Sequence, residues 1–374
     1  MKVNKIKFIL FLYHLLFTIV SYQYAVNNKA DSHLYWAKTF SIDQYSWLDF
    51  LDLNTNFILF LNYPLIILGF PFLFGFLLYC IIGFLGILKF IQWAELAFVG
   101  GFEFRGINMS YLIFFLPNLH FWTATLGKEP IIFWGIASVL FGITTEKYKS
   151  FSFILGSLAI LIIRPHVALM LLSAIAVVFL FHKTFSLKRR ILLAAITFTG
   201  VLVLLYVVFQ STNINYWDWK RICYFNEYSI LSFKHSGSYV PMLDYSYGYK
   251  WFSFNFRPLF FDAHSTLTVL ASIENLFSLV VFVTALFLII RFYHSIDFTV
   301  QIKVIFLFTF IACLLYVERY ANLGIFMRTK IMFSPLYANC FILYYQTGCY
   351  FEPFQNLNEK SKTFPNNHCS AFAR

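Results

Sequence analysis

Long apolar blocks dominate this sequence, and they constrain its fold more than any other feature. Of the 374 residues, 60% are hydrophobic and only 12% are charged, whereas a soluble domain carries about 25% charged residues. This leaves too little polar material to cover a water-facing surface, which excludes a soluble enzyme and a disordered chain. The apolar residues run in blocks and do not alternate, which excludes an outer-membrane barrel. The composition is typical of a polytopic helical membrane protein.

The lengths of the apolar blocks predict about ten membrane spans, because a bilayer core needs about 20 apolar residues per helix. The predicted spans are 6–24, 71–91, 108–126, 130–144, 150–164, 166–181, 190–210, 264–290, 300–317 and 329–346. The pairs that meet near residue 128 and near Arg164 are short, so we expect kinked or broken helices that do not fully cross. The apolar segment 57–69 is also short and contains Pro64, which predicts an interfacial or re-entrant segment.

The predicted fold class is all-α, with a transmembrane domain over residues 1–346 and a short cytoplasmic tail over 347–374. The first apolar block has the charged start of a signal peptide but no small-residue cleavage site after it, so we interpret it as a retained helix. With ten spans both termini are cytoplasmic, and the Lys and Arg clusters gather on that side, as the positive-inside rule requires. The net charge of +11 therefore indicates membrane topology and not a nucleic-acid partner.

This topology also collects polar residues at the external face, in the loops 25–56 and 211–262 and in three shorter turns. Charges near a bilayer are costly, so they usually have a partner or a task. Arginines there suit bidentate binding of phosphate oxygens, and carboxylates suit general-base chemistry. The alternative is that these groups only pair with one another or extend toward lipid headgroups.

The candidate catalytic carboxylates are Asp31, Glu129 and Glu318. Asp31 is the preferred base because it follows the first span directly, although an Asp at this position also suits a helix N-cap. Lys128-Glu129 also suits a local ion pair at the start of a span. A further carboxylate, Glu274, lies inside the predicted span 264–290, where it is a candidate to face the bundle interior.

The candidate phosphate-binding cations are Arg164, His166, Arg328, Lys330, Lys128 and Arg319. The tripeptide Arg164-Pro165-His166 interrupts an apolar run of some 30 residues, and proline ends a helix there. A hairpin turn alone does not need two cationic groups beside the proline, which favours a functional site over a simple turn.

The candidate glycan-binding residues are His33, Tyr35, Trp36, His120, Trp217 and Trp219. Aromatic rings stack on the apolar faces of sugar rings, but they also form interfacial belts in membrane proteins. The loop 211–262 is rich in Tyr and Trp, which slightly favours sugar binding. A lone histidine such as His120 is more often structural.

Other chemistries leave no trace in the sequence. It contains no Walker A, GxGxxG, HExxH or GxSxG motif, which argues against a primary pump and a cytoplasmic nucleotide-sugar enzyme. Its six cysteines form no disulfide framework or CxxC metal site. No cofactor is required by the sequence, and a divalent metal has no support in it. An activated substrate must therefore arrive through the membrane or from the external side.

Three segments then resemble a known group of proteins: FLPNLHFWTATLGKE (115–129), LIIRPHVALMLL (161–172) and YANLGIFMRTKIMFSPLY (320–337). They are similar to segments of bacterial surface-polysaccharide membrane proteins, the Wzy-like repeat-unit polymerases and the GT-C-type glycosyltransferases. The element DSHLYW (31–36) resembles the short acidic motif in the first external loop of GT-C enzymes. It has one acidic residue beside the membrane, where many members have an adjacent pair. The resemblance covers residues 1–345 in order.

The resemblance implies a GT-C-like helical bundle in the bacterial inner membrane, working with other polysaccharide assembly proteins. Such an enzyme transfers a sugar or a repeat unit from a polyprenyl phosphate or diphosphate carrier at the external face. By this resemblance Asp31 is the base, and Arg164, His166, Arg328 and Lys330 hold the carrier phosphates. The alternatives are a transporter or flippase for a lipid-linked oligosaccharide and a non-catalytic subunit of a polysaccharide assembly complex.

Overall fold

The structure is a computed structural model that describes residues 2–97, 103–104, 107–181, 186–212, 218–292 and 298–333. This part of the chain is helical, which confirms the predicted all-α class. The helices are α1 (Lys2–Asn27), α2 (Ser32–Tyr35), α3 (Thr55–Ile67), α4 (Phe72–Ala97), α5 (Pro117–Thr123), α6 (Lys128–Thr144), α7 (Phe151–Ile163), α8 (Pro165–Leu180), α9 (Leu187–Thr212), α10 (Trp219–Leu231), α11 (Tyr247–Phe256), α12 (Thr266–Phe292), α13 (Val300–Tyr316) and α14 (Leu323–Lys330). Short 3-10 turns join several of them, and β1 (Glu103–Phe104) pairs antiparallel with β2 (Ile107–Asn108).

Four helices in the described residues are long and apolar enough to cross a membrane: α1, α4, α9 and α12. The pair α5 and α6 makes a fifth if it is counted as one broken span. The other apolar helices, α3, α7, α8 and α13, are shorter than 18 residues. The chain is thus a helical protein with spans suited to a membrane, but the predicted count of ten is not confirmed. The last predicted span, 329–346, lies largely outside the described residues.

The breaks near residue 128 and Arg164 are confirmed. The chain bends by 112° between α5 and α6. The predicted span 108–126 is instead a 3-10 segment (Met109–Phe115) followed by the short α5. Pro117 and Pro165 each stand at the first turn of a helix, where proline's missing N–H costs nothing. Arg164 therefore lies in a non-helical link between α7 and α8.

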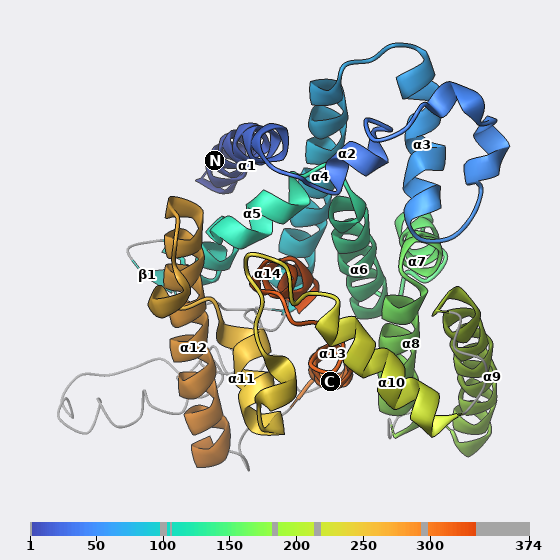
Figure 1. The fold of residues 1–374 in the computed structure, drawn as a ribbon. Coiled ribbons are helices and arrows are strands. Elements are labelled where there is room, and N and C mark those ends of the chain that lie inside the picture. Colours follow the sequence, from blue (N-terminus) through green and yellow to red (C-terminus); the bar gives the residue numbers. More distant parts are fainter. Residues whose placement is uncertain are drawn as a thin grey trace.

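Helix α6 lies in the core, where it packs against α4 and α7, while α8 packs against α9 and α13 (Figure 1). Glycines allow the closest of these contacts. A Cβ atom on Gly135 of α6 would lie 2.8 Å from the carbonyl oxygen of Gly156 in α7. Small residues of this kind let the backbones of membrane helices approach, so α6 and α7 pack closely together at these glycines.

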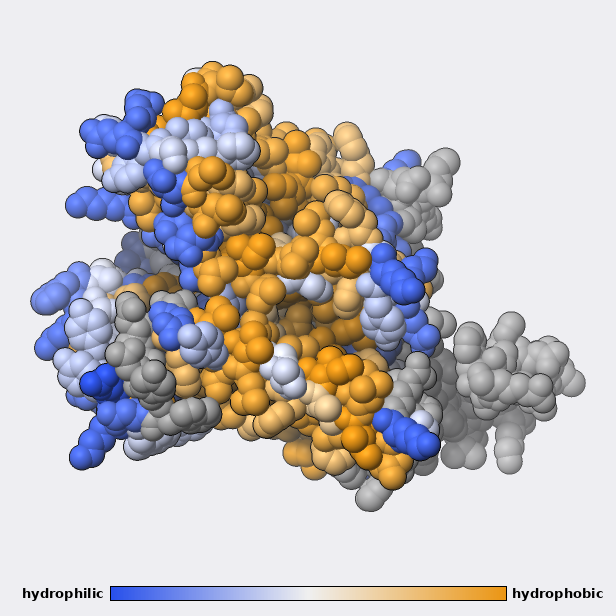
Figure 2. All heavy atoms as spheres, turned by 90° about the vertical axis from the view of Figure 1, so that its right-hand side faces the viewer, coloured by the Kyte–Doolittle hydropathy of each residue, from blue (hydrophilic) through white to orange (hydrophobic). Residues whose placement is uncertain are grey.

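The outer side of the molecule at α9 is apolar. Figure 2 shows this face as a broad hydrophobic surface with a hollow in its middle and hydrophilic groups on two opposite sides. Large side chains of α9, such as Ile191, Ile196 and Phe198, are exposed there. A helix in contact with lipid has this character, so α9 has the surface of a lipid-facing helix.

Candidate functional site

A buried carboxylate joins two arginines from distant parts of the chain. Glu129 lies in the first turn of α6, and its side chain is only 3% exposed. Its Oε1 accepts hydrogen bonds from Nη2 of Arg164 and from Nε of Arg328. Arg328 in turn donates from Nη1 to Oδ2 of Asp31 at 2.5 Å. We call these four residues the ionic network.

Local structure places each member of the ionic network. Asp31 directly precedes α2, and Glu129 follows the bend between α5 and α6. Arg164 is fixed by the proline break, and Arg328 lies in the last turn of α14. The cap of α14 is Asn322, whose side chain accepts from the backbone N–H of Ile325 at 3.1 Å. Helix ends and breaks therefore bring the four side chains together.

The ionic network runs from the interior to the surface. The side chain of Asp31 is 62% exposed, in contrast to the buried Glu129. Burial lowers the pKa of Arg328, but the charges of Glu129 and Asp31 outweigh it and hold that pKa well above its usual value. Arg328 is therefore a fixed cation. Burial also raises the pKa of the neighbouring Tyr35 to about 12, so its phenol stays neutral.

Positive charge is in excess around the ionic network. Lys128 is close enough to both arginines and both carboxylates to interact with them electrostatically, and within the described residues it forms no salt bridge. Arg164, Arg328 and Lys128 thus face two carboxylates. His166 lies near Arg164, Lys128 and Arg319, and its buried Nε2 has no hydrogen-bond partner in the described part of the chain. Such a site suits an anion.

The ionic network forms one wall of a cavity of about 650 Å³. Asp31, Glu129 and Arg328 line it, together with Tyr24 and Trp122. The guanidinium of Arg328 lies 5.7 Å from the ring centre of Trp122, over its face, which adds a cation–π contact. A cavity with a few converging polar groups is the usual form of a small-molecule site. We call it the ionic cavity.

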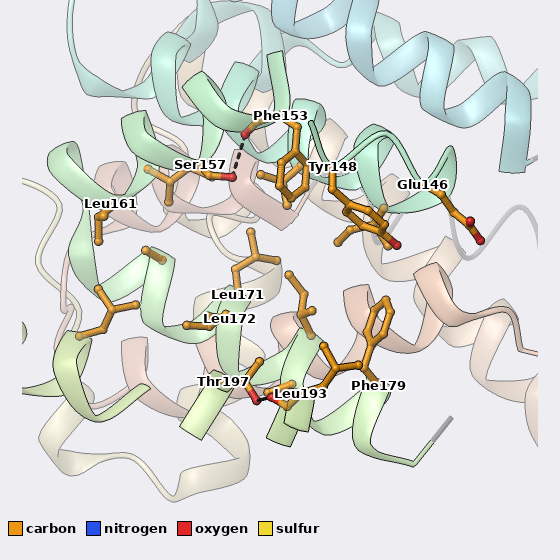
Figure 3. A pocket seen from close by; sticks show the side chains of 17 residues that line it. Glu146, Tyr148, Phe153, Ser157, Leu161, Leu171, Leu172, Phe179, Leu193 and Thr197 are labelled. Carbon is orange, nitrogen blue, oxygen red and sulfur yellow. Dashed lines mark hydrogen bonds between the residues drawn. The ribbon is translucent and has the colours of Figure 1, made fainter. Parts of the chain in front are cut away.

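A separate groove of about 670 Å³ lies among α6, α7, α8 and α9. Figure 3 shows its side chains, with Leu161 near one end and Glu146 and Tyr148 near the other. The hydroxyls of Ser157 and Thr197 donate to carbonyls of their own helices, so they do not converge on a ligand. The groove is apolar, and it suits a hydrocarbon chain.

Three of the other predicted site residues, Glu318, Lys330 and Arg319, make their contacts away from the ionic network. Glu318 pairs with Lys250 at 3.0 Å. Lys330 is buried and donates from Nζ to the carbonyl oxygen of Arg257 at 2.8 Å and to Oδ1 of Asn275 at 2.9 Å. Residues two apart on a helix point in nearly opposite directions, so Lys330 cannot share the site of Arg328. Lys330 instead joins α14 to α12, which corrects its predicted place among the phosphate ligands. Arg319 is half-buried, and its Cζ lies 4.1 Å from the ring centre of Phe225.

Most predicted glycan contacts are unsuitable for sugar stacking. Trp36 packs into the core against α4, and His120 is fully buried with its Nδ1 2.9 Å from Nδ1 of His14. Tyr35 is buried as well, and His33 stacks on Phe72 with ring centres 5.2 Å apart. Trp219 is exposed at the start of α10, whereas Trp217 lies outside the described residues. The expected stacking roles of Trp36 and His120 are therefore wrong, because neither ring has a free face.

Trp122 lines the ionic cavity but was not among the predicted glycan contacts, whereas the predicted contact Tyr35 does line it, as does Tyr24. The position of Trp122, four residues after Asn118 in α5, gives no sequence signal for this role. Within the described residues no group of three or more His, Cys, Asp or Glu side chains is arranged to hold a metal ion. No family model, curated protein or solved structure matches this chain, so the geometry alone carries the functional argument.

Proposed function

We propose that this chain is a membrane glycosyltransferase or an oligosaccharide repeat-unit polymerase of the inner membrane. It transfers a sugar or glycan from a polyprenyl phosphate or diphosphate carrier at the external membrane face. One observation carries the proposal: an ionic network, with Lys128 beside it as an additional cation and an exposed carboxylate at its outer end, borders a cavity in an apolar helical protein. A membrane-bound anion with a sugar attached is the substrate that fits this combination.

The cations hold the carrier phosphate. Lys128 and Arg328 present positive charge beside the ionic cavity, and Arg164 extends it toward α8. The buried ring of His166 lies near these cations and contributes an unpartnered ring nitrogen, not a charge. Arginine binds phosphate oxygens in a bidentate manner. The buried Glu129 keeps the two guanidinium groups in place, so we assign it a positioning role and not that of a base.

The chemical step is a displacement at the anomeric carbon of the donor sugar. A hydroxyl oxygen of the acceptor forms a bond to this carbon, while the bond from the carbon to the phosphate oxygen breaks. The electron pair of that bond remains on the phosphate, where the fixed cations stabilise the growing negative charge. The hydroxyl proton passes to the carboxylate of Asp31, the exposed member of the network.

The apolar groove accommodates the hydrocarbon chain of the carrier. Ala168, which lines the groove, lies one helical turn beyond Arg164. The groove then follows α8 as far as Phe179, over roughly 17 Å at the rise of an α-helix. A phosphate near Arg164 would place the start of the carrier chain about one helical turn from this groove, which α9 also lines.

The proposal is tested by glycan profiling of the source strain with this gene deleted and then complemented with wild type or Arg328→Ala. A polymerase predicts loss of long chains with single repeats retained, and a glycosyltransferase predicts loss of one sugar from every repeat. Lipid-linked repeats that accumulate on the cytoplasmic side would instead indicate the flippase alternative. A normal profile in the deletion strain would contradict any role in glycan assembly.

A further inference from the structure

A second cavity, of about 450 Å³, adjoins the ionic cavity. It lies among α1, α5, α12 and α14, and we call it the neighbouring cavity. The two cavities have six lining residues in common: Tyr24, Phe121, Trp122, Gly237, Ser238 and Gly324. A ligand in one cavity therefore lies against the same wall as a ligand in the other.

The neighbouring cavity is lined by hydrogen-bonding groups, unlike the apolar groove. Arg257 and Asp262 form a bidentate ion pair there, with donor–acceptor distances of 2.6 and 3.0 Å. Both are about nine-tenths buried. Glu274 is also buried and accepts a hydrogen bond from the backbone N–H of Asn118 at 2.7 Å. Buried charged groups beside a cavity fit a ligand with many hydroxyl groups better than a hydrocarbon chain.

The shared wall combines a flat aromatic surface with small residues. Trp122 and Tyr24 provide rings suited to packing on a sugar face. On the same wall, Gly237 and Ser238 lie on a segment that is fixed to the start of α14. Val240 N–H donates to the carbonyl of Ala321 at 2.9 Å, and Leu323 N–H donates to that of Ser238 at 3.0 Å.

Gly237 leaves space open where the two cavities meet. Within the described residues, a Cβ atom at Gly237 would have no atom beyond its chain neighbours within 4 Å, and the φ of Gly237 lies outside the positive region that favours glycine. A side chain could therefore be added at this position without strain, and it would extend into the open space beside both cavities. Because Gly237 has no side chain, no side chain from this position separates the two cavities.

We propose that the neighbouring cavity is the acceptor site, which binds a hydroxyl-rich saccharide. The saccharide packs on Trp122 and presents its attacking hydroxyl to the ionic cavity past Gly237. Arg257, Asp262 and Glu274 fix the orientation of its other hydroxyls. This inference rests on the proposed function, since it assigns the second substrate of the same reaction.

The variant Gly237→Phe tests the proposal, with Gly248→Phe as the matched control. Gly248 lies in α11, lines neither cavity, and also has open space around an added Cβ without a positive φ. Both proteins are purified in lipid nanodiscs. Farnesyl diphosphate probes the ionic cavity, and a fluorescently labelled one-repeat oligosaccharide, released from the polysaccharide of the source cells, probes the neighbouring cavity.

Gly237→Phe should weaken binding of the oligosaccharide by at least about tenfold relative to Gly248→Phe and reduce glycan transfer. Because Gly237 lines both cavities, a second variant, Ala271→Trp, tests whether the two sites are separate, since Ala271 lines the neighbouring cavity and not the ionic cavity. Ala271→Trp should weaken oligosaccharide binding to a similar extent and leave farnesyl diphosphate binding within about twofold of wild type. Unchanged oligosaccharide binding in the folded variants, or an equal loss of both probes in Ala271→Trp, would overturn the assignment of a separate acceptor site. Arg328→Ala tests the proposed function separately from the acceptor site. Retained farnesyl diphosphate binding in that variant would refute the proposed function itself.

Discussion

Glu129 and Arg328 lie 199 residues apart in the chain and form an ion pair in the protein interior. Because Glu129 also pairs with Arg164, this one carboxylate links the start of α6, the break between α7 and α8, and the end of α14. Arg164 has Glu129 as its ion-pair partner, and an unpaired buried charge is strongly unfavourable. The pair therefore stabilises the fold and also holds the cations beside the cavity.

The first prediction concerns the cost of removing that carboxylate. Glu129→Gln keeps the size of the side chain but leaves the buried Arg164 without a counter-charge and Arg328 with only the exposed Asp31. We expect a loss of about 3–5 kcal/mol in the free energy of unfolding, seen as a lower midpoint of thermal unfolding in detergent. Glu227→Gln, at an exposed position on α10, serves as the control. Equal midpoints for the two variants would show that Glu129 does not hold the arginines.

The second prediction separates catalysis from stability at Asp31. Asp31→Asn can still accept a hydrogen bond from Arg328 but cannot take up a proton. Because the ion pair is largely exposed at Asp31, the free energy of unfolding should change by less than about 1 kcal/mol. The rate of glycan transfer should fall by roughly 10²–10⁴-fold. Asp43→Asn, in the same loop, should leave the rate unchanged, and an equal rate in both variants would exclude Asp31 as the base.

The third prediction concerns the hydrocarbon chain of the carrier. Ala176→Trp would fill the apolar groove shown in Figure 3, whereas Ile196→Trp adds the same ring on the exposed side of α9. We expect Ala176→Trp to raise KM for a long-chain polyprenyl donor and to leave KM for a short-chain donor unchanged. If KM for both donors responds in the same way, the groove does not bind the chain.

The fourth prediction is a pH dependence of stability at Asp262. Burial raises the pKa of this carboxyl group, but hydrogen bonds from Arg257 and the backbone of Leu259 outweigh it, and the pKa lies below its ordinary value of 3.8. The unfolded chain therefore takes up a proton here first as the pH falls. The stabilisation is present above about pH 4 and is lost below it.

This dependence is measured by thermal unfolding of wild type and Asp262→Asn at about pH 6 and about pH 3. The difference in midpoint between the two proteins should be large at the higher pH and small at the lower one. A difference that does not change with pH would show that the carboxylate is not stabilised by Arg257.

The sequence identified the members of the ionic network as candidates and left open whether they pair with one another. Asp31, Glu129, Arg164 and Arg328 each follow a local signal, such as Pro165 or the end of an apolar block, and these signals survive in the structure. The count of ten spans is not confirmed by the described residues, because hydropathy does not distinguish a buried short helix from a full span. Helix α6, for example, is apolar and packs in the protein core.

The predictions for Trp36 and His120 fail for one reason, and the prediction for Lys330 fails for another. Whether Trp36 or His120 faces a cavity or the core depends on the tertiary packing of α4 and α5, which leaves no periodic signal in such short segments. Lys330 is different, since its separation from Arg328 follows from helix geometry alone. No sequence pattern predicts the Arg257–Asp262 pair, because only the fold of the loop before α12 brings these two residues to a cavity.

The central claim is that Arg328 binds the phosphate of a lipid-linked glycan donor. It is tested most directly by measuring glycan transfer by the purified protein in nanodiscs, using lipid-linked saccharide extracted from the source cells. Arg328→Ala is compared with wild type and with Arg221→Ala, which removes an exposed arginine of α10. We predict that Arg328→Ala abolishes transfer while Arg221→Ala retains it. Full activity in a folded Arg328→Ala variant would contradict the account.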